Sequence, residues 1–218
     1  MIDISIKARL LVIPMVMIIL CLPLKALAGI QEDFLWAVES NNLTDVSKLL
    51  EKGASPDVPN GNGYTPLMIA AQTKNFPLAR LLVQAGAKLN IRNRYGETAI
   101  MLASYQGHTE MVKLLYVKGA EINHAGWNPL IYAASGGHLN TMQLLLNGGA
   151  EINSTSENGT TAVMMAVRGN HFDAVSLLIN NGADASIRNE QGDNALHWAR
   201  KRDHQKIADL LSARGVRE

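Results

Sequence analysis

The stretch GAEINHAGWNPLIYAASGGH, residues 119–138, contains the features that decide the fold of this chain. Its two histidines, its tryptophan and its Asn128-Pro129 turn are residue types found at binding and catalytic sites. The same stretch also contains a glycine that follows a Leu-rich segment and a capping residue that precedes an Ala-rich segment, and both features recur along the chain. Recurrence at a fixed period indicates stacked repeats, in which each unit buries its apolar face against its neighbours.

Two series of glycines keep one period. One series follows the Leu-rich segments, at Gly53, Gly86, Gly119, Gly149, Gly182 and Gly215. The other series lies in the polar links, at Gly63, Gly96, Gly126, Gly159 and Gly192. Both series advance by the interval that separates Gly53 from Gly86. Each series has one shorter step, which runs from Gly119 to Gly149 in the first series and from Gly96 to Gly126 in the second. Because two independent series share one period and one irregularity, we interpret the chain as an array of repeated units.

Each unit is predicted to contain two short helices. Thr or Asn, which are favoured as N-caps, precedes an Ala-rich segment such as PLMIAAQ at 66–72 or PLIYAAS at 129–135. A Leu-rich segment such as LARLLVQAG at 78–86 follows, and it ends at a glycine, the residue favoured in the left-handed conformation that closes a helix. Polar links that contain glycine, such as IRNRYGE at 91–97, predict loops that project as tight hairpins.

These segments resemble the ankyrin repeat family. The motifs that carry the resemblance are TPLMIAA (65–71), GHTEMVKLL (107–115), NPLIYAASGGH (128–138) and NALHWA (194–199). The resemblance covers about residues 30–217 and implies an all-α ankyrin-repeat solenoid of stacked helix-turn-helix units with projecting β-hairpin loops. We expect one ankyrin repeat domain over 29–218, with an N-terminal cap at 30–60, repeats at about 61–93, 94–124, 125–155 and 156–188, and a C-terminal repeat at 189–217.

Residues 1–28 are predicted to be a signal peptide. Lys7 and Arg9 form a basic region before the apolar run at 10–24, and Ala26 and Ala28 supply the small residues at −3 and −1 of a cut before Gly29. The apolar run is shorter than the roughly 20 residues that span a bilayer. An uncleaved membrane anchor is the alternative interpretation.

The composition limits which cellular compartment and which class of partner are expected. Cys21 is the only cysteine, so a chain cleaved after residue 28 has no disulfide, no thiolate metal site and no thiol nucleophile. The 20 basic and 19 acidic residues leave no excess of positive charge for nucleic acid, which we exclude as a partner. The resemblance to exported bacterial ankyrin proteins implies the periplasm, with secretion or membrane anchoring as alternatives.

Four histidines recur at one position, after the turn that follows the first helix of a unit. They are His108, His138, His171 and His204. Stacked repeats would place them about 10 Å apart in a row, whereas a metal site requires side chains that converge. The resemblance implies that these histidines bond to the backbone of neighbouring turns, so we predict a structural role and no metal.

An Asp–His pair occurs near the last helix pair. Asp193 lies four residues before His197. We interpret the pair as a polar contact at a helix start, because no serine elbow, HExxH motif or phosphate loop accompanies it. A hydrolase or metalloenzyme that uses Asp193 and His197 is the enzymatic alternative.

The shorter step predicts one short loop. Gly119 and Gly126 are seven residues apart, whereas Gly86 and Gly96 are ten apart, so the loop at 123–126 lacks three residues at its tip. A short loop leaves a notch beside Trp127. We interpret it as a tolerated deletion in an exposed loop, with a binding notch as the alternative.

The resemblance implies that a partner protein binds to the loop tips and to the exposed side of the first helices. The variable positions there that we predict to contact a partner are Tyr64, Gln72, Arg94, Tyr95, Glu97, Tyr105, Trp127, Ser135, Thr160, Arg168, Asp193 and Lys201. Tyrosine and tryptophan are frequent interface anchors, because they combine a large apolar body with a polar tip.

The sequence thus predicts a non-enzymatic protein-protein interaction module that acts as a scaffold, an inhibitor or a stabiliser of another protein. We expect a monomer with no cofactor and no catalytic residues, free of the membrane after signal cleavage. A membrane-tethered interaction protein is the alternative if the N-terminal segment is retained.

Overall fold

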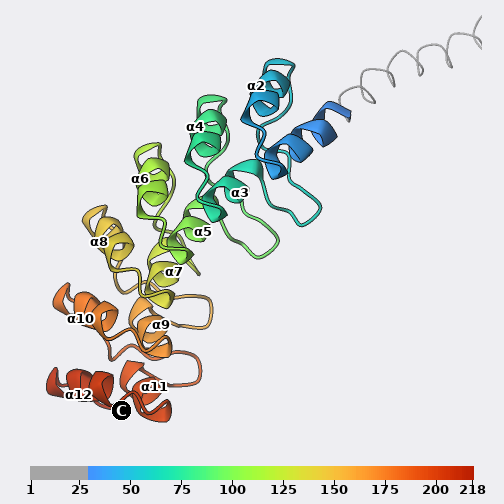
Figure 1. Ribbon diagram of the computed structural model, residues 1–218. Coiled ribbons are helices and arrows are strands. Elements are labelled where there is room, and N and C mark those ends of the chain that lie inside the picture. The colour runs from blue at the N-terminus through green and yellow to red at the C-terminus, as the bar shows by residue number, and fades with distance from the viewer. Residues whose placement is uncertain (1–28) are drawn as a thin grey trace, which may run out of the picture.

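The computed structural model describes residues 29–218, which form a curved stack of helix pairs (Figure 1). A helix over residues 29–39 begins the stack and packs with α2 as its N-terminal cap. The inner row of helices consists of α3 (Pro66–Gln72), α5 (Ala99–Tyr105), α7 (Pro129–Ser135), α9 (Ala162–Arg168) and α11 (Ala195–Lys201). The outer row consists of α2 (Leu43–Glu51), α4 (Phe76–Gln84), α6 (Thr109–Val117), α8 (Leu139–Asn147), α10 (Phe172–Asn180) and α12 (Gln205–Ala213).

The spacing of the helices confirms the predicted repeat. Successive inner helices begin at equal intervals along the chain, except that the step from α5 to α7 is shorter than the others. The shortening falls between two helices of full length, so it removes residues from a loop alone. The all-α solenoid predicted from the sequence is therefore confirmed over the described residues.

Side chains at the predicted N-caps begin the inner helices. The Asn128 side chain accepts a hydrogen bond from the Ile131 backbone N–H at 3.0 Å, and Asn194 accepts one from the His197 backbone N–H at 2.9 Å. Such bonds satisfy donors that the helix itself leaves unpaired. Thr98 has the same extended backbone, but its buried hydroxyl has no hydrogen-bond partner among residues 29–218.

Alanines allow the inner helices to pack closely. Ala71, Ala103, Ala134, Ala166 and Ala199 are fully buried at the contacts between successive helices of the inner row. Methionine and leucine side chains from the outer row fill the space behind them. The core is therefore a continuous strip that runs along the stack, and each unit depends on its neighbours for burial.

One row of hydrogen bonds ties successive units together, from the N-terminal cap to the unit that contains α9 and α10. The side chain of Asn90 accepts from the Glu121 backbone N–H at 3.0 Å, Asn123 from that of Glu151 at 2.9 Å, and Asn153 from that of Asp184 at 2.8 Å. Asp57 makes the same contact with the Lys88 backbone N–H at 2.8 Å. Asn123 belongs to the shortened loop, so this cross-link is kept where residues are missing.

The predicted structural role of the histidines is confirmed for three of the four. A ring nitrogen of His138 lies 2.8 Å from the Tyr105 carbonyl oxygen, and one of His171 lies 3.1 Å from that of Ser135. The His108 ring bonds to the Ala71 carbonyl oxygen at 3.0 Å. These bonds connect neighbouring turns and leave the rings spread along the stack.

His204 differs from the other three, because a nitrogen of its ring is left without a hydrogen bond within residues 29–218. The rings of His138 and His171 lie against Gly107 and Gly137, where a Cβ atom would overlap them. The corresponding residues beside His108 and His204 are Lys74 and Asn170, which carry a Cβ at φ values of 58° and 57°, so this difference alone does not account for His204. The Nδ1 atom of His204 is buried without a partner among the described residues.

The predicted loops project from the inner row on the inside of the curve (Figure 1). Four of them are closed by one backbone hydrogen bond of 2.9 Å, from Asn60 to Tyr64, from Asn93 to Glu97, from Ser156 to Thr160 and from Asn189 to Asp193. They form no strand ladder, and an isolated bridge between Thr155 and Thr161 is the single β pairing within 29–218.

The predicted signal peptide and Cys21 lie outside the described residues, so that assignment stays a prediction. Within 29–218, none of the helices has the length and apolar character needed to cross a bilayer.

The helix-closing glycines provide a test of the register. Gly86 and Gly182 have φ values of 82° and 88°, and neither has an atom within 4 Å of the place where a Cβ would stand. Substitution by valine therefore acts through backbone conformation alone, and we expect Gly86→Val or Gly182→Val to lower the free energy of unfolding by about 1 kcal/mol or more. Urea unfolding measures this loss.

Gly61 is the matched control. It lies in an open loop and has no positive φ, so Gly61→Val should leave stability within about 0.5 kcal/mol of the unsubstituted chain. Equal losses at Gly61 and Gly86 would contradict the proposed helix ends.

Candidate partner-binding surface

The structure places most of the predicted contact residues on one face. The loop row, which we define as the residues directly before the N-caps, consists of Tyr64, Glu97, Trp127, Thr160 and Asp193. The helix-end row, which we define as the last residues of the inner helices, consists of Gln72, Tyr105, Ser135, Arg168 and Lys201. Both rows belong to the inside of the curve, so residues far apart in sequence share one concave surface (Figure 1).

Thr160 is the exception, and its prediction as a contact residue is wrong. Its relative exposure is 2%, and its backbone N–H donates to the Ser156 hydroxyl at 3.1 Å. The Thr160 side chain is therefore part of the closed loop and is not accessible to a partner.

Two predicted residues lie on a loop tip. Tyr95 is 76% exposed, which makes it the most exposed of the large apolar side chains in the described chain. The neighbouring Arg94 lies against the preceding loop, where its guanidinium donates to the Gly61 carbonyl oxygen at 3.0 Å. Arg94 thus braces two loops, while the Tyr95 ring is free.

Three rings form an aromatic cluster, which we define as Tyr105, Trp127 and Tyr132. The Tyr105 and Tyr132 rings meet edge to face with centroids 5.9 Å apart, and the Trp127 and Tyr132 rings are 5.4 Å apart. Such pairs add to the stabilisation that burial alone provides. The cluster joins the ends of α5 and α7 to the short loop.

A hydrogen bond to Glu97 fixes the central ring. The Tyr132 hydroxyl donates to Glu97 Oε1 at 2.9 Å, and Glu97 Oε2 accepts from Asn93 Nδ2 at 2.8 Å. Burial raises the pKa of the Tyr132 phenol, and the charge and hydrogen bond of Glu97 raise it further. The Tyr132 side chain is therefore a neutral donor held in one orientation.

The cluster lines an open hollow of about 370 Å³ on the concave face. Its remaining lining includes Ser135, Met165 and Arg168 from the ends of α7 and α9. Tyr105, Trp127, Ser135 and Arg168 were each predicted from sequence, and the structure brings these four together.

Tyr132 is a residue of the candidate site that the sequence did not predict. The corresponding residues in other units are Ile69, Leu102, Met165 and Trp198, which are largely apolar and typical of a packed position. The available signal was the phenol itself, since a hydroxyl at an otherwise apolar position requires a partner.

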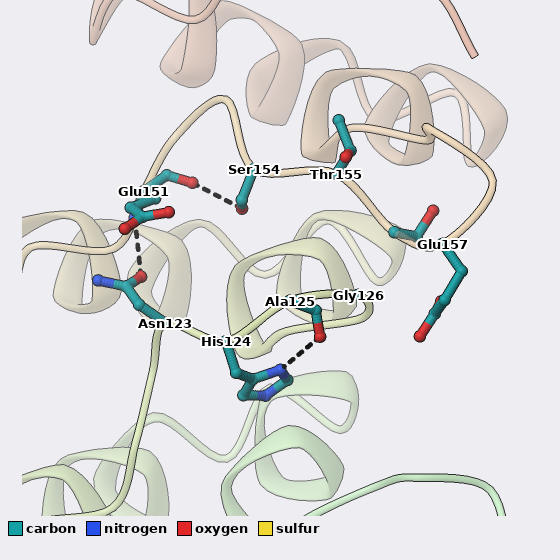
Figure 2. Close-up of a pocket in the computed structure, with 9 residues that line it drawn as sticks. Asn123, His124, Ala125, Gly126, Glu151, Ser154, Thr155 and Glu157 are labelled. Carbon is teal, nitrogen blue, oxygen red and sulfur yellow. Dashed lines mark hydrogen bonds between the residues drawn. The ribbon is translucent and has the colours of Figure 1, made fainter. Parts of the chain in front are cut away.

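The shortened loop opens the predicted notch, which Figure 2 shows. It measures about 660 Å³ and lies between residues 123–126 and the next loop at 151–157. The Glu157 carboxylate lies against Gly126, where any Cβ atom would overlap it. The short loop thus borders an open cavity, and an acidic side chain of the next loop lies against its glycine, as Arg94 lies against Gly63 in the full-length loops.

The Asp193–His197 contact has a structural explanation. The carboxylate oxygens of Asp193 lie 3.3 Å from His197 Nε2 and 3.2 Å from Trp198 Nε1. The carboxylate thus holds two side chains at the start of α11. Across residues 29–218, no cluster of three or more His, Cys, Asp or Glu side chains is placed to hold a metal ion.

A protein-family model described as ankyrin repeats in three copies matches residues 34–126, 86–156 and 130–217. The chain belongs to the ankyrin repeat family. The ankyrin repeats of this chain mark it as a protein-protein interaction module, and domains of this family are generally non-enzymatic.

Curated relatives share a short segment with this ankyrin repeat protein. The palmitoyltransferase ZDHHC13 of Mus musculus and that of Homo sapiens are each 52% identical to it over 40 residues. That segment is 18% of this chain and 6% of the relatives, so the likeness covers a small part of either protein.

Proposed function

We propose that this ankyrin repeat protein is a non-enzymatic module that binds one partner protein on its concave face, as a scaffold, an inhibitor or a stabiliser. The aromatic cluster of Tyr105, Trp127 and Tyr132 carries the proposal, because it presents large rings beside an open hollow. Interface energy concentrates in such anchors, which are enriched in tryptophan and tyrosine.

The rings suit binding because they are already held in place. Tyr132 is fixed by Glu97 and by both neighbouring rings, so little side-chain entropy is lost when a partner docks. The cluster also stands on helices that are cross-linked from unit to unit. A preorganised surface of this kind binds with little rearrangement.

Basic and acidic side chains lie on opposite sides of the concave face. Arg168 and Lys201 stand at the ends of α9 and α11, whereas Glu97 and Asp193 stand at the loop side of the inner helices. The two signs are separated by about 10 Å, the length of a seven-residue helix. A partner with complementary charges would be oriented as it docks.

We further propose that the protein acts in the periplasm as a monomer, without a cofactor and without nucleic acid. The basic and apolar pattern of residues 1–28 supports export, and the near-balance of charge supports a protein partner. The intact mass of the protein purified from its host tests the export step. A mass that begins at Gly29 is expected, and a mass that includes residues 1–28 would instead favour membrane tethering.

Site-specific photo-crosslinking tests the proposed binding face. A photoreactive phenylalanine replaces Tyr105 in the cluster or, as the matched control, Tyr116 on α6; these tyrosines are 49% and 37% exposed. In the native host, the probe at 105 should capture one partner protein in at least fivefold greater yield than the probe at 116, as mass spectrometry of the adducts would show.

Equal capture from both positions would place the interface elsewhere. No adduct at either position, with both variants folded, would overturn the proposed protein-binding function.

A further inference from the structure

The aromatic cluster is flanked by two carboxylates that have no cation. Glu97 accepts the Tyr132 hydroxyl hydrogen, and Glu157 lies against Gly126, the residue before Trp127. Burial is the largest cause of the raised pKa of Tyr132. The charge and hydrogen bond of Glu97 raise this pKa further, and the charge of Glu157 makes a smaller contribution in the same direction. Both carboxylates therefore act on the same ring. The three ion pairs within residues 29–218 involve neither of them.

The arginines of the loops do not neutralise these carboxylates. Arg92 donates to the Gly96 carbonyl oxygen at 3.0 Å, and Arg94 donates to that of Gly61 at 3.0 Å. Each of the two guanidinium groups braces loop backbone. Arg168 lines the hollow from the end of α9, at the side opposite the loops. The loop side of the cluster is thus acidic and aromatic.

The last repeat contains a related arrangement, in which an aromatic side chain bonds to a carboxylate of its own loop and a cation lies over the ring. Trp198 occupies the helix position that Tyr132 occupies in α7, and its indole N–H donates to the Asp193 carboxylate at 3.2 Å. The Arg202 guanidinium lies over the Trp198 ring, with Cζ 5.8 Å from the centroid. The residue that corresponds to Arg202 beside Tyr132 is Gly136, which has no side chain. The Tyr132 ring therefore lacks the internal cation that its counterpart has.

The short loop leaves this region uncovered. A full-length loop packs on the loop before it, as Arg94 does on Gly61 and as the Glu190 backbone N–H does on the Asn158 carbonyl oxygen at 3.0 Å. The loop at 123–126 lacks the three tip residues that would pack on the Tyr95 loop in this way.

We propose that the aromatic cluster binds the guanidinium group of an arginine side chain of the partner protein, with Glu97 and Glu157 as its counter-charges. The inference rests on the proposed function and adds the chemistry of the anchor. Arginine fits better than lysine, because its planar group stacks on rings while its five N–H donors reach two carboxylates at once.

A peptide titration followed by NMR tests the arginine site. The probe is the pentapeptide acetyl-Gly-Ser-Arg-Ser-Gly-amide, added to the ¹⁵N-labelled protein, and the signal is the indole N–H of Trp127. That resonance should shift saturably, while those of Trp36 and Trp198 stay in place. The same peptide with uncharged citrulline should bind about fivefold more weakly or worse, and the lysine peptide should lie between the two.

Two variants check the assigned groups. Glu157→Gln should lower the affinity for the arginine peptide about threefold to fivefold. Glu190→Gln, at the same position of the next loop, is the matched control and should leave this affinity unchanged. Tyr132→Ile, which installs the residue found at position 69, should abolish the Trp127 shift while the helical circular dichroism spectrum is kept.

Three results would overturn the inference: no Trp127 shift, equal binding of the citrulline peptide, or equal effects of the two glutamate substitutions. A partner crosslinked at position 105 together with no arginine response would leave the proposed function standing and remove the arginine site. A specific arginine response together with no crosslinked protein would support the site and overturn the protein-binding function.

Discussion

The register between neighbouring units is the constraint on which the rest of the structure depends. Buried alanines set how closely the inner helices approach, and the asparagine row of Asn90, Asn123 and Asn153 bonds three consecutive units to the backbone of the next. No unit can bury its core alone, so these contacts act together along the stack. The concave face is built on helices that this packing holds in register.

A change of length is tolerated only where it leaves the register intact. The three missing residues fall at a loop tip, and Asn123, which makes the cross-link to the next unit, is retained. The deletion therefore has its consequences on the surface. It borders the notch between two loops, beside the aromatic cluster that contains Trp127. Within this one repeat, the residues that maintain the stack are therefore different from those that form the candidate site.

Periodicity in the sequence was sufficient to predict the helices, their capping residues and the short loop. It also predicted four of the residues that line the hollow, because variable positions between fixed ones are readable from the repeat itself. Two outcomes depended on contacts that the repeat pattern does not encode. From the repeat pattern, Tyr132 is expected at an apolar packing position. The structure shows that its hydroxyl donates to Glu97 of the preceding unit. Thr160 reads as variable, yet its own loop buries it.

The most direct test of the account restores the missing length. Insertion of the uncharged tripeptide Pro-Asn-Gly, copied from residues 59–61, between His124 and Ala125 restores the interval found between the other units without adding charge. Crosslinking from position 105 and thermal unfolding are then measured on this variant. If the short loop is what exposes the binding surface, partner capture should fall at least fivefold while the unfolding midpoint stays within a few degrees. Undiminished capture by the folded variant would contradict the account.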